Sequence, residues 1–241
     1  MSPRTFKVIV AKLSAFVALA TAAVPAGADT TIVLNFAGLN GASREGVANY
    51  YDGGLGSLGS GPGPNYGITF GSDAITCATA PACNTAEIPG GAGANAVFFV
   101  TGTGDIMNRA AGFTTGFSFF YTAANQPGTV SVYSGLNGTG SLLASLSLPV
   151  TGNGATTPGC MGTNFCPYTA FGVTFKGTAE SVDFSGTENQ IGFADITLGS
   201  ATAGGGKGVP EPATLSLVVA GLIGLCFMRR RRPGPMARTT S

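Results

Sequence analysis

The sequence predicts an all-β protein, with an antiparallel β-sandwich or jelly-roll-like ectodomain between an N-terminal signal peptide and a single C-terminal transmembrane helix. Two observations predict the sandwich: short aromatic and β-branched runs recur between glycine-rich turns, and no amphipathic helical pattern separates them. A third observation, an uncharged apolar stretch near each end, predicts the flanking segments. The predicted division is signal peptide 1–28, ectodomain 29–200, glycine-rich linker 201–208, C-terminal signal 209–232 and cytoplasmic tail 233–241.

The first 28 residues have the composition of a secretory signal peptide. Arg4, Lys7 and Lys12 precede an apolar, alanine-rich stretch, and Ala26-Gly27-Ala28 supplies the small residues that signal peptidase requires. Cleavage is expected before Asp29, because the apolar stretch is short and Pro25 interrupts it. Signal peptidase is therefore an expected partner.

The first half of the ectodomain contains short apolar runs at 31–36, 68–70 and 96–100, each predicted to be a strand. Between the first two runs, residues 49–67 contain too much glycine and proline for a regular element. Loops of this length are often either functional or disordered. Tyr50, Tyr51 and Tyr66 lie on this loop, where they either form an exposed platform for sugar rings or pack the loop onto the domain.

The second half of the ectodomain alternates more regularly. Phe117, Phe119 and Tyr121 occupy alternate positions, as expected of a strand with one buried face. An Asn137-Gly138 step is typical of the turn between two strands. Strands are predicted at 113–121, 129–133, 142–150, 171–176, 181–184 and 190–198.

Four of the five cysteines form two pairs with the same spacing, namely Cys77 with Cys83 and Cys160 with Cys166. In an exported protein an even set of cysteines predicts disulfides. Four cysteines allow three pairings, of which we favour the local one. A zinc site is the less favoured alternative, because neither pair has the short spacing of common zinc ligands. The fifth, Cys226, lies within the predicted transmembrane helix.

The C-terminal segment has three parts in a fixed order: a proline-rich hexapeptide, an uncharged apolar run and an arginine cluster. A helix over 213–228 would be about 24 Å long, and arginine stems can extend from it to the headgroups of a bilayer. The arginine cluster orients the helix with its C-terminal end in the cytoplasm. The hexapeptide is Val209, Pro210, Glu211, Pro212, Ala213 and Thr214, and the cluster is Arg229, Arg230, Arg231 and Arg232.

This order of parts resembles the PEP-CTERM sorting signal of exported proteins in exopolysaccharide-producing Gram-negative bacteria. The resemblance implies that an exosortase recognises the chain, cuts near Pro210-Glu211-Pro212, and releases or re-anchors the ectodomain. It also implies that the chain is first held in the inner membrane, with its ectodomain in the periplasm, and is delivered to the cell surface after processing. Residues 34–39, 49–51, 64–70, 182–186 and 191–198 resemble the β-sandwich domains common in PEP-CTERM proteins. The tail at 233–241 departs from the sorting signal, which usually ends soon after its arginine cluster.

Charge is unevenly distributed along the chain. The whole sequence has 12 basic and 11 acidic residues. Residues 29–208, however, contain four basic and ten acidic residues, so the exported part has a net charge of −6. This distribution leaves no basic surface for nucleic acid.

The sequence contains no histidine, which excludes Ser-His-Asp and Cys-His nucleophilic systems and imidazole metal ligands. The favoured interpretation is a non-enzymatic cell-surface or matrix-associated protein in an exopolysaccharide context. A carbohydrate-binding module is the alternative. A hydrolase is less favoured, and so is an ice-binding protein, because the sequence has no regular threonine array. Acidic residues that a hydrolase could use, or that simply form turns and solvated surface, are Asp52, Asp73, Asp105, Asp183, Glu180, Glu188 and Asp195.

No cofactor is predicted apart from one structural calcium ion. Asp183, Glu188 and Asp195 lie on or near the last two predicted strands and offer carboxylate oxygens, the ligands that calcium prefers. The chain has no contiguous Asp-x-Asp-x-Asp loop, so the predicted site depends on the fold bringing these residues together.

Overall fold

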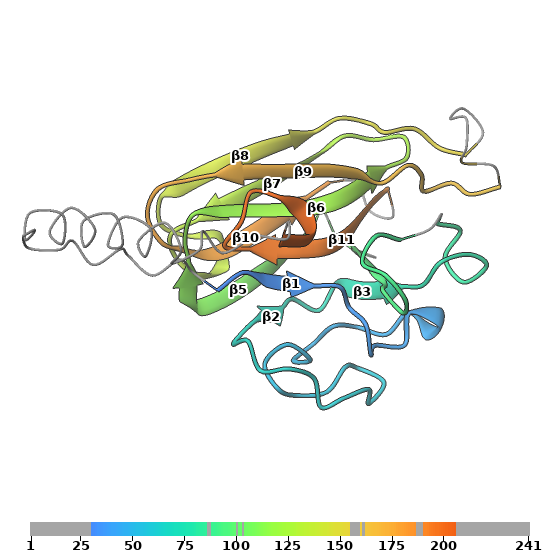
Figure 1. The fold of residues 1–241 in the computed structure, drawn as a ribbon, viewed down its shortest axis with the longest axis horizontal. Coiled ribbons are helices and arrows are strands. Elements are labelled where there is room, and N and C mark those ends of the chain that lie inside the picture. The colour runs from blue at the N-terminus through green and yellow to red at the C-terminus, as the bar shows by residue number, and fades with distance from the viewer. Residues whose placement is uncertain are drawn as a thin grey trace, which may run out of the picture.

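The computed structural model is a β-sandwich of two antiparallel sheets, as the sequence predicts (Figure 1). It describes residues 30–205 apart from 86–87, 100, 103, 155–159, 161 and 187–189. The predicted signal peptide, sorting signal and cytoplasmic tail lie outside the described residues. Within the described part of the chain, no helix is long and apolar enough to cross a membrane.

The described residues form eleven strands and three short 3₁₀ turns. The strands are β1 (Ile32–Leu34), β2 (Thr69–Phe70), β3 (Ala74–Cys77), β4 (Ala96–Phe99), β5 (Gly104–Phe113), β6 (Gly116–Ala123), β7 (Gly128–Tyr133), β8 (Leu142–Leu148), β9 (Thr169–Thr174), β10 (Ala179–Ser185) and β11 (Ile191–Leu198). The turns are η1 (Gly41–Ser43), η2 (Leu136–Gly138) and η3 (Ala203–Gly205).

The six-stranded sheet has the order β3-β4-β11-β6-β9, with β1 as a further partner of β11. β4 pairs with β11 at Gly192 and Phe193, and β1 pairs with it at 196–198. The register with β6 shifts between Ala194 and Thr197, where the backbone of Asp195 has a φ of 47°. A β-bulge therefore stands where β11 exchanges one partner for another.

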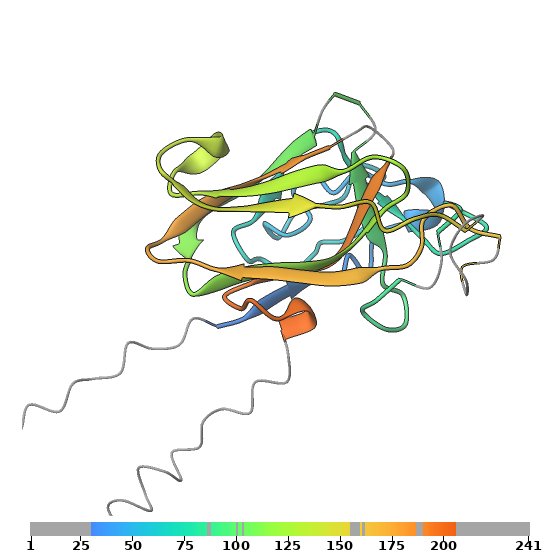
Figure 2. The same ribbon diagram turned by 90° about the horizontal axis from the view of Figure 1, so that it is seen from above.

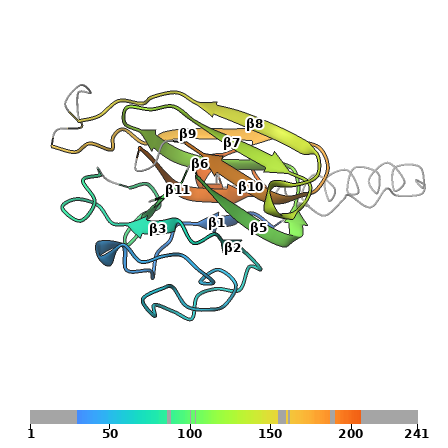
Figure 3. The same ribbon diagram turned by 180° about the vertical axis from the view of Figure 1, so that it is seen from behind.

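The five-stranded sheet has the order β2-β5-β10-β7-β8 and forms the second layer (Figures 1 and 3). Val182 and Phe184 of β10 point into the sandwich, so the intervening Asp183 points away from it. In β7 the predicted alternation is confirmed, because Val130 and Val132 are buried. Alternation thus assigns one face of each central strand to the core.

The core between the sheets is dominated by aromatic rings. Phe117, Phe119 and Tyr121 of β6 are buried, which confirms the prediction from their alternation. Phe184 and Phe193, from opposite sheets, meet edge-to-face with ring centroids 4.9 Å apart. Such offset contacts between buried rings add to the free energy gained from burying apolar area.

Two strands escaped the sequence-based prediction, β3 and β5. β5 places Asp105 at an inward position beside Met107, so its sequence shows no clean apolar alternation. Within the predicted linker, Ala203–Gly205 form η3, and the Gly204 amide donates to the Thr197 hydroxyl at 3.1 Å.

The two ends of the described chain lie beside each other, as Figure 2 shows for the blue start and the orange-red end. A Cβ at Gly205 would lie 3.2 Å from side-chain atoms of both Thr31 and Val33. The segments that precede and follow the domain therefore connect to it at neighbouring points.

Candidate functional site

Two disulfide-closed loops cover part of the outer face of the six-stranded sheet. The predicted local pairing is confirmed: Cys77 bonds to Cys83 and Cys160 to Cys166, each with Cα atoms 5.6 Å apart. The four sulfur-bearing side chains are buried. A second hydrophobic cluster fills the space beneath the first loop; its buried members are Cys77, Cys83, Ile88, Ala94, Ala96, Phe98 and Ala194.

The two loops are tied to each other by hydrogen bonds although they lie about 80 residues apart in the chain. The carbonyl oxygen of Asn84 accepts from the amides of Asn164 and Phe165, at 3.0 and 3.3 Å. The buried Thr85 hydroxyl lies 3.2 Å from the Phe165 carbonyl and 3.0 Å from the Tyr168 hydroxyl. These contacts hold the loops at a fixed distance from each other.

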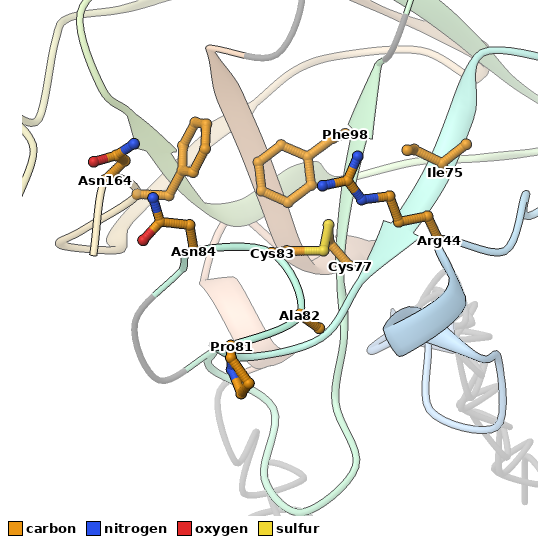
Figure 4. Close-up of a pocket in the computed structure, with 10 residues that line it drawn as sticks. Arg44, Ile75, Cys77, Pro81, Ala82, Cys83, Asn84, Phe98 and Asn164 are labelled. Atoms are coloured by element: carbon orange, nitrogen blue, oxygen red, sulfur yellow. A yellow bond between two sulfur atoms is a disulfide. The ribbon is translucent and has the colours of Figure 1, made fainter. Parts of the chain in front are cut away.

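A pocket of about 420 Å³ opens at this junction (Figure 4). Its volume is within the range of small-ligand sites. Figure 4 shows the Arg44 side chain extending toward the Phe98 ring from one side, with the amides of Asn84 and Asn164 on the other. The lining residues are Arg44, Ile75, Cys77, Pro81, Ala82, Cys83, Asn84, Phe98, Asn164 and Phe165.

Arg44 reaches the pocket because the turn η1 is held close to β3. The turn starts at Gly41, whose carbonyl oxygen accepts from the Ala78 amide at 3.2 Å. A Cβ at Gly41 would collide with the side-chain oxygen of Asn95, so only glycine permits this approach. Asn95 is itself fixed, because its amide donates to the carbonyls of Phe36 and Leu39, both at 3.0 Å.

The apolar part of the pocket consists of two rings. Phe98 of β4 is buried on the outer face of the sheet and contacts Phe165 edge-on, with centroids 5.1 Å apart. Opposite Phe98 in the sheet is Gly192, where a Cβ would press into the Phe98 ring. Phe165 is only half-buried, so part of its ring is available to a ligand.

Charge in the pocket is opposite in sign to that of the domain. Among the described residues that line it, Arg44 carries a full charge and none is acidic. Arg44 is exposed, and its guanidinium has no hydrogen bond or ion pair with any described residue. A pocket with one unpaired guanidinium, two amides and an aromatic floor can bind a polar ligand that has both hydroxyl or carboxylate groups and an apolar face.

The predicted tyrosine platform is wrong for two of its three members. Tyr50 and Tyr51 are 7% and 3% exposed, and the Tyr51 hydroxyl oxygen accepts from the Phe36 amide at 2.7 Å. Only Tyr66, 38% exposed and stacked on Tyr51 at 6.1 Å, reaches the surface. The alternative, that these rings pack the loop onto the domain, is confirmed for Tyr50 and Tyr51.

The residues predicted to bind calcium are not brought together. Asp183 lies on β10 of one sheet and Asp195 on β11 of the other, and Glu188 lies outside the described residues. Across the described chain, no group of three or more acidic or cysteine side chains could hold a metal ion. Asp195 is nevertheless unusual, because it is 6% exposed and its Oδ1 has no hydrogen-bond partner. Burial raises its pKa above the ordinary value.

Among the other acidic candidates, Asp105 is the most perturbed. It is 8% exposed, its Oδ2 has no partner, and burial raises its pKa to about 6, with Asp73 and Asp183 adding to the rise. Asp73 accepts from the Thr101 hydroxyl. Asp105 does not line the pocket between the disulfide loops. Asp52 lies in the glycine-rich loop, where its backbone forms an isolated antiparallel β-bridge with Asn65. Glu180 lies on β10.

Sequence reasoning singled out none of the polar pocket residues. Arg44, Asn84 and Asn164 stand alone in turn sequences, without a motif around them. The equal spacing of the two cysteine pairs was the available signal, because each pair marks a loop that forms one side of the pocket.

Comparison with protein families identifies a PEP-CTERM protein-sorting motif at residues 208–232. This finding confirms the resemblance of the C-terminal segment and indicates an exported protein that is sorted through its C-terminus. No curated protein matches the sequence.

Solved structures give partial likenesses to the sandwich. One is a glycoside hydrolase family 43 arabinoxylan arabinofuranohydrolase from Bacillus subtilis, with 19% identity and a TM-score of 0.35, covering 54% of this chain and 25% of that chain. Another is the C-terminal CBM6 of the laminarinase LamC from Zobellia galactanivorans, with 14% identity and a TM-score of 0.30, covering 54% and 89%. A third is a carbohydrate binding module of Cellvibrio mixtus lichenase 5A, with 10% identity and a TM-score of 0.32, covering 53% and 86%. At these TM-scores the likenesses support no conclusion about function.

Proposed function

Starting from the sorting motif at residues 208–232, we propose that this chain is a non-enzymatic protein that an exosortase delivers to the cell surface or extracellular matrix. Signal peptidase removes residues 1–28, the helix at 213–228 holds the chain in the inner membrane, and Arg229–Arg232 remain on the cytoplasmic side. Exosortase then cuts near Pro210-Glu211-Pro212. The β-sandwich is the part that is delivered.

At its destination the sandwich binds saccharide in the pocket between the disulfide loops. The observation that supports this role is the convergence of the Arg44 guanidinium, the amides of Asn84 and Asn164, and the half-buried Phe165 ring at one cavity. Amides and guanidinium supply directional hydrogen bonds to sugar hydroxyls, and an aromatic ring covers the apolar face of a pyranose.

A binding role is favoured over hydrolysis by the chemistry of the pocket. Glycoside hydrolysis needs two carboxyl groups on either side of the scissile bond. The described lining residues include no carboxyl group, and the acidic residue with the most perturbed pKa, Asp105, lies elsewhere. The histidine-free sequence also excludes imidazole-based catalysis.

Sorting is tested by mass spectrometry of the C-terminus in envelope and secreted fractions. We expect the delivered protein to end near residues 209–214, and Glu211→Ala to leave the chain uncut in the envelope. A chain with Lys207→Gln serves as a matched control outside the hexapeptide and should be processed normally. Detection of intact Ser241 in every fraction of the unaltered protein would contradict processing.

Saccharide binding is tested by affinity electrophoresis of the full-length protein through gels that contain defined polysaccharides. We expect retardation by at least one polysaccharide, and Phe165→Ala to abolish it. Tyr66→Ala is the control for the exposed ring outside the pocket and should leave the retardation unchanged. Free migration of the unaltered protein through neutral and acidic polysaccharides alike would contradict a saccharide-binding role.

A further inference from the structure

We propose that the pocket between the disulfide loops selects saccharides that carry a carboxylate, and that Arg44 is the residue that binds this group. The inference rests on the proposed saccharide-binding role and specifies the ligand class of the same site. It follows from three features of Arg44: its charge environment, its backbone conformation and its position relative to the two amides.

The charge environment of Arg44 favours an anionic ligand. The net charge of residues 29–208, with four basic and ten acidic side chains, opposes acidic polymers, so attraction has to come from a local positive charge. Arg109 is engaged, because its guanidinium donates to the carbonyls of Tyr66 and Gly112. Arg44 has no such partner among the described residues and no described acid beside it in the pocket. A carboxylate ligand would supply the missing acceptor.

The chemistry of the guanidinium makes a carboxylate its best partner. Its parallel N–H groups match the two oxygens of a carboxylate, and charge-assisted hydrogen bonds are about twice as strong as neutral ones. A neutral hydroxyl uses only one N–H and leaves the charge uncompensated. Arg44 therefore discriminates by charge, whereas Asn84 and Asn164 recognise the hydroxyl groups that acidic and neutral sugars share.

The backbone at Arg44 points to the same role. Arg44 follows η1 with a φ of 54° and a ψ of 50°, a left-handed conformation that glycine and asparagine adopt most readily. Asn84, on the opposite wall, is also left-handed, with a φ of 50°. The backbone at Arg44 is thus unfavourable for any residue with a Cβ, and arginine at this position places a guanidinium in the pocket. Strained positions of this kind cluster at ligand sites.

The left-handed backbone also gives the cleanest test. Arg44→Gly removes the charge and relaxes the backbone, so a loss of binding cannot be attributed to a failure to fold. Lys176→Gln is the matched control, because it removes one positive charge from an exposed position beyond the far end of β9. Thermal unfolding of both variants should match or exceed that of the unaltered protein.

The probe is an oligogalacturonate and its methyl ester, which have the same sugar backbone and differ only at the carboxyl group, charged in the acid and neutral in the ester. Binding to the full-length protein is measured by isothermal titration calorimetry at low and physiological salt. We expect the acid form to bind about tenfold more tightly than the ester, the preference to weaken with salt, and Arg44→Gly to equalise the two. Lys176→Gln should retain the preference, and Arg44→Lys should retain only part of it.

Two other outcomes would separate this inference from the proposed function. Equal affinity of the unaltered protein for acid and ester, with loss of both in Phe165→Ala, would overturn the role of Arg44 and leave saccharide binding intact. An acid preference that survives Arg44→Gly would likewise overturn it. Failure of the unaltered protein to bind either form, or any polysaccharide in the gel assay, would overturn both proposals.

Discussion

At the scale of single residues, Glu45 is an acidic side chain that binds three backbone amides. It is fully buried, and its carboxylate accepts from the amides of Asn40, Leu58 and Ser60 at 2.7, 2.9 and 3.0 Å. These bonds order the glycine-rich loop that composition alone left either functional or disordered. Burial raises the pKa of Glu45, but the hydrogen bonds from Ser60, Asn40 and Leu58 outweigh it and the pKa is lowered.

Replacing Glu45 by glutamine should therefore destabilise the domain. The amide has one acceptor oxygen where the carboxylate has two, so at least one buried backbone amide loses its partner, at a cost of about 1–3 kcal/mol. Denaturant unfolding at pH 7 measures this loss, and Glu180→Gln on β10 is the control. Because the folded pKa of Glu45 is depressed, its contribution is present above the unfolded pKa and disappears as the pH falls through the folded value. A variant as stable as the unaltered protein at pH 7 would contradict this account.

Asp105 should have the opposite dependence on pH. Its pKa is raised to about 6, chiefly by burial, so the folded state binds a proton more tightly than the unfolded state between roughly pH 4 and 6. Stability from this group is present at low pH and declines as the pH rises through that window. Asp105→Asn should stabilise the protein at pH 7.5 by about 1 kcal/mol, after allowance for solvent screening, and have little effect at pH 4. Melting temperatures of the variant and the unaltered protein at the two pH values test this prediction. A variant less stable than the unaltered protein at pH 7.5 would contradict it.

At the scale of elements, the bulge in β11 explains why Asp195 is buried without a partner. Asp195 lies between the part of β11 that pairs with β4 and the part that pairs with β1, and two glycines lie next to its side chain. A Cβ at Gly90 would collide with its Oδ1, and a Cβ at Gly204 would lie 3.5 Å from its Oδ2. Glycine at these two positions permits close packing against a carboxylate whose Oδ1 is buried without a partner. Because that oxygen has no partner, calcium binding at Asp195 stays a prediction.

The calcium prediction is tested by thermal unfolding with and without the ion. We expect millimolar calcium to raise the melting temperature of the unaltered protein, since a ligand that binds only the folded state stabilises it. Asp195→Asn should remove the effect, and Asp183→Asn should retain it because Asp183 lies on the other sheet. No change in melting temperature on adding calcium or a chelator would contradict a calcium site at Asp195.

The disulfide loops are expected to matter more for binding than for stability. Each bridge closes a loop with a sequence separation of six residues, so the entropic stabilisation from each is about 2–3 kcal/mol at most. Replacing Cys160 and Cys166 by serine should lower the melting temperature by about 10 °C at most yet abolish retention on polysaccharide, because Asn164 and Phe165 lose their positions. Unchanged retention, measured in the same gels, would contradict the structural role assigned to the second loop.

At the scale of the whole molecule, most of the basic residues lie in the segments before and after the domain. The full chain has a calculated pI of about 7.6, whereas residues 29–208 have a net charge of −6. We therefore expect delivery to convert a near-neutral precursor into an acidic product. Isoelectric focusing of envelope and secreted fractions checks this, with Glu211→Ala as the uncut control. A secreted form that focuses with the precursor would contradict removal of the basic ends.

The sequence by itself determined the class of the fold and the sorting motif, and it favoured the local pairing of the cysteines that the structure confirms. Each is encoded locally: alternation with a period of two places one face of a strand in the core, and the motif and the cysteine spacing are read from neighbouring residues. The strands with the cleanest alternation, β6 and β7, were predicted accordingly. β5 was missed, because Asp105 occupies one of its buried positions.

Only the tertiary structure decided where the candidate site lies. Arg44, Phe98 and Asn164 come from three distant parts of the chain, and they converge because β3 and β4 pair at one edge of a sheet and Asn84 and Thr85 tie the disulfide loops together. It also decided that Tyr50 and Tyr51 are buried and that Asp183 and Asp195 belong to different sheets. Strand order and the packing of loops depend on contacts between residues far apart in sequence, and no local pattern records them.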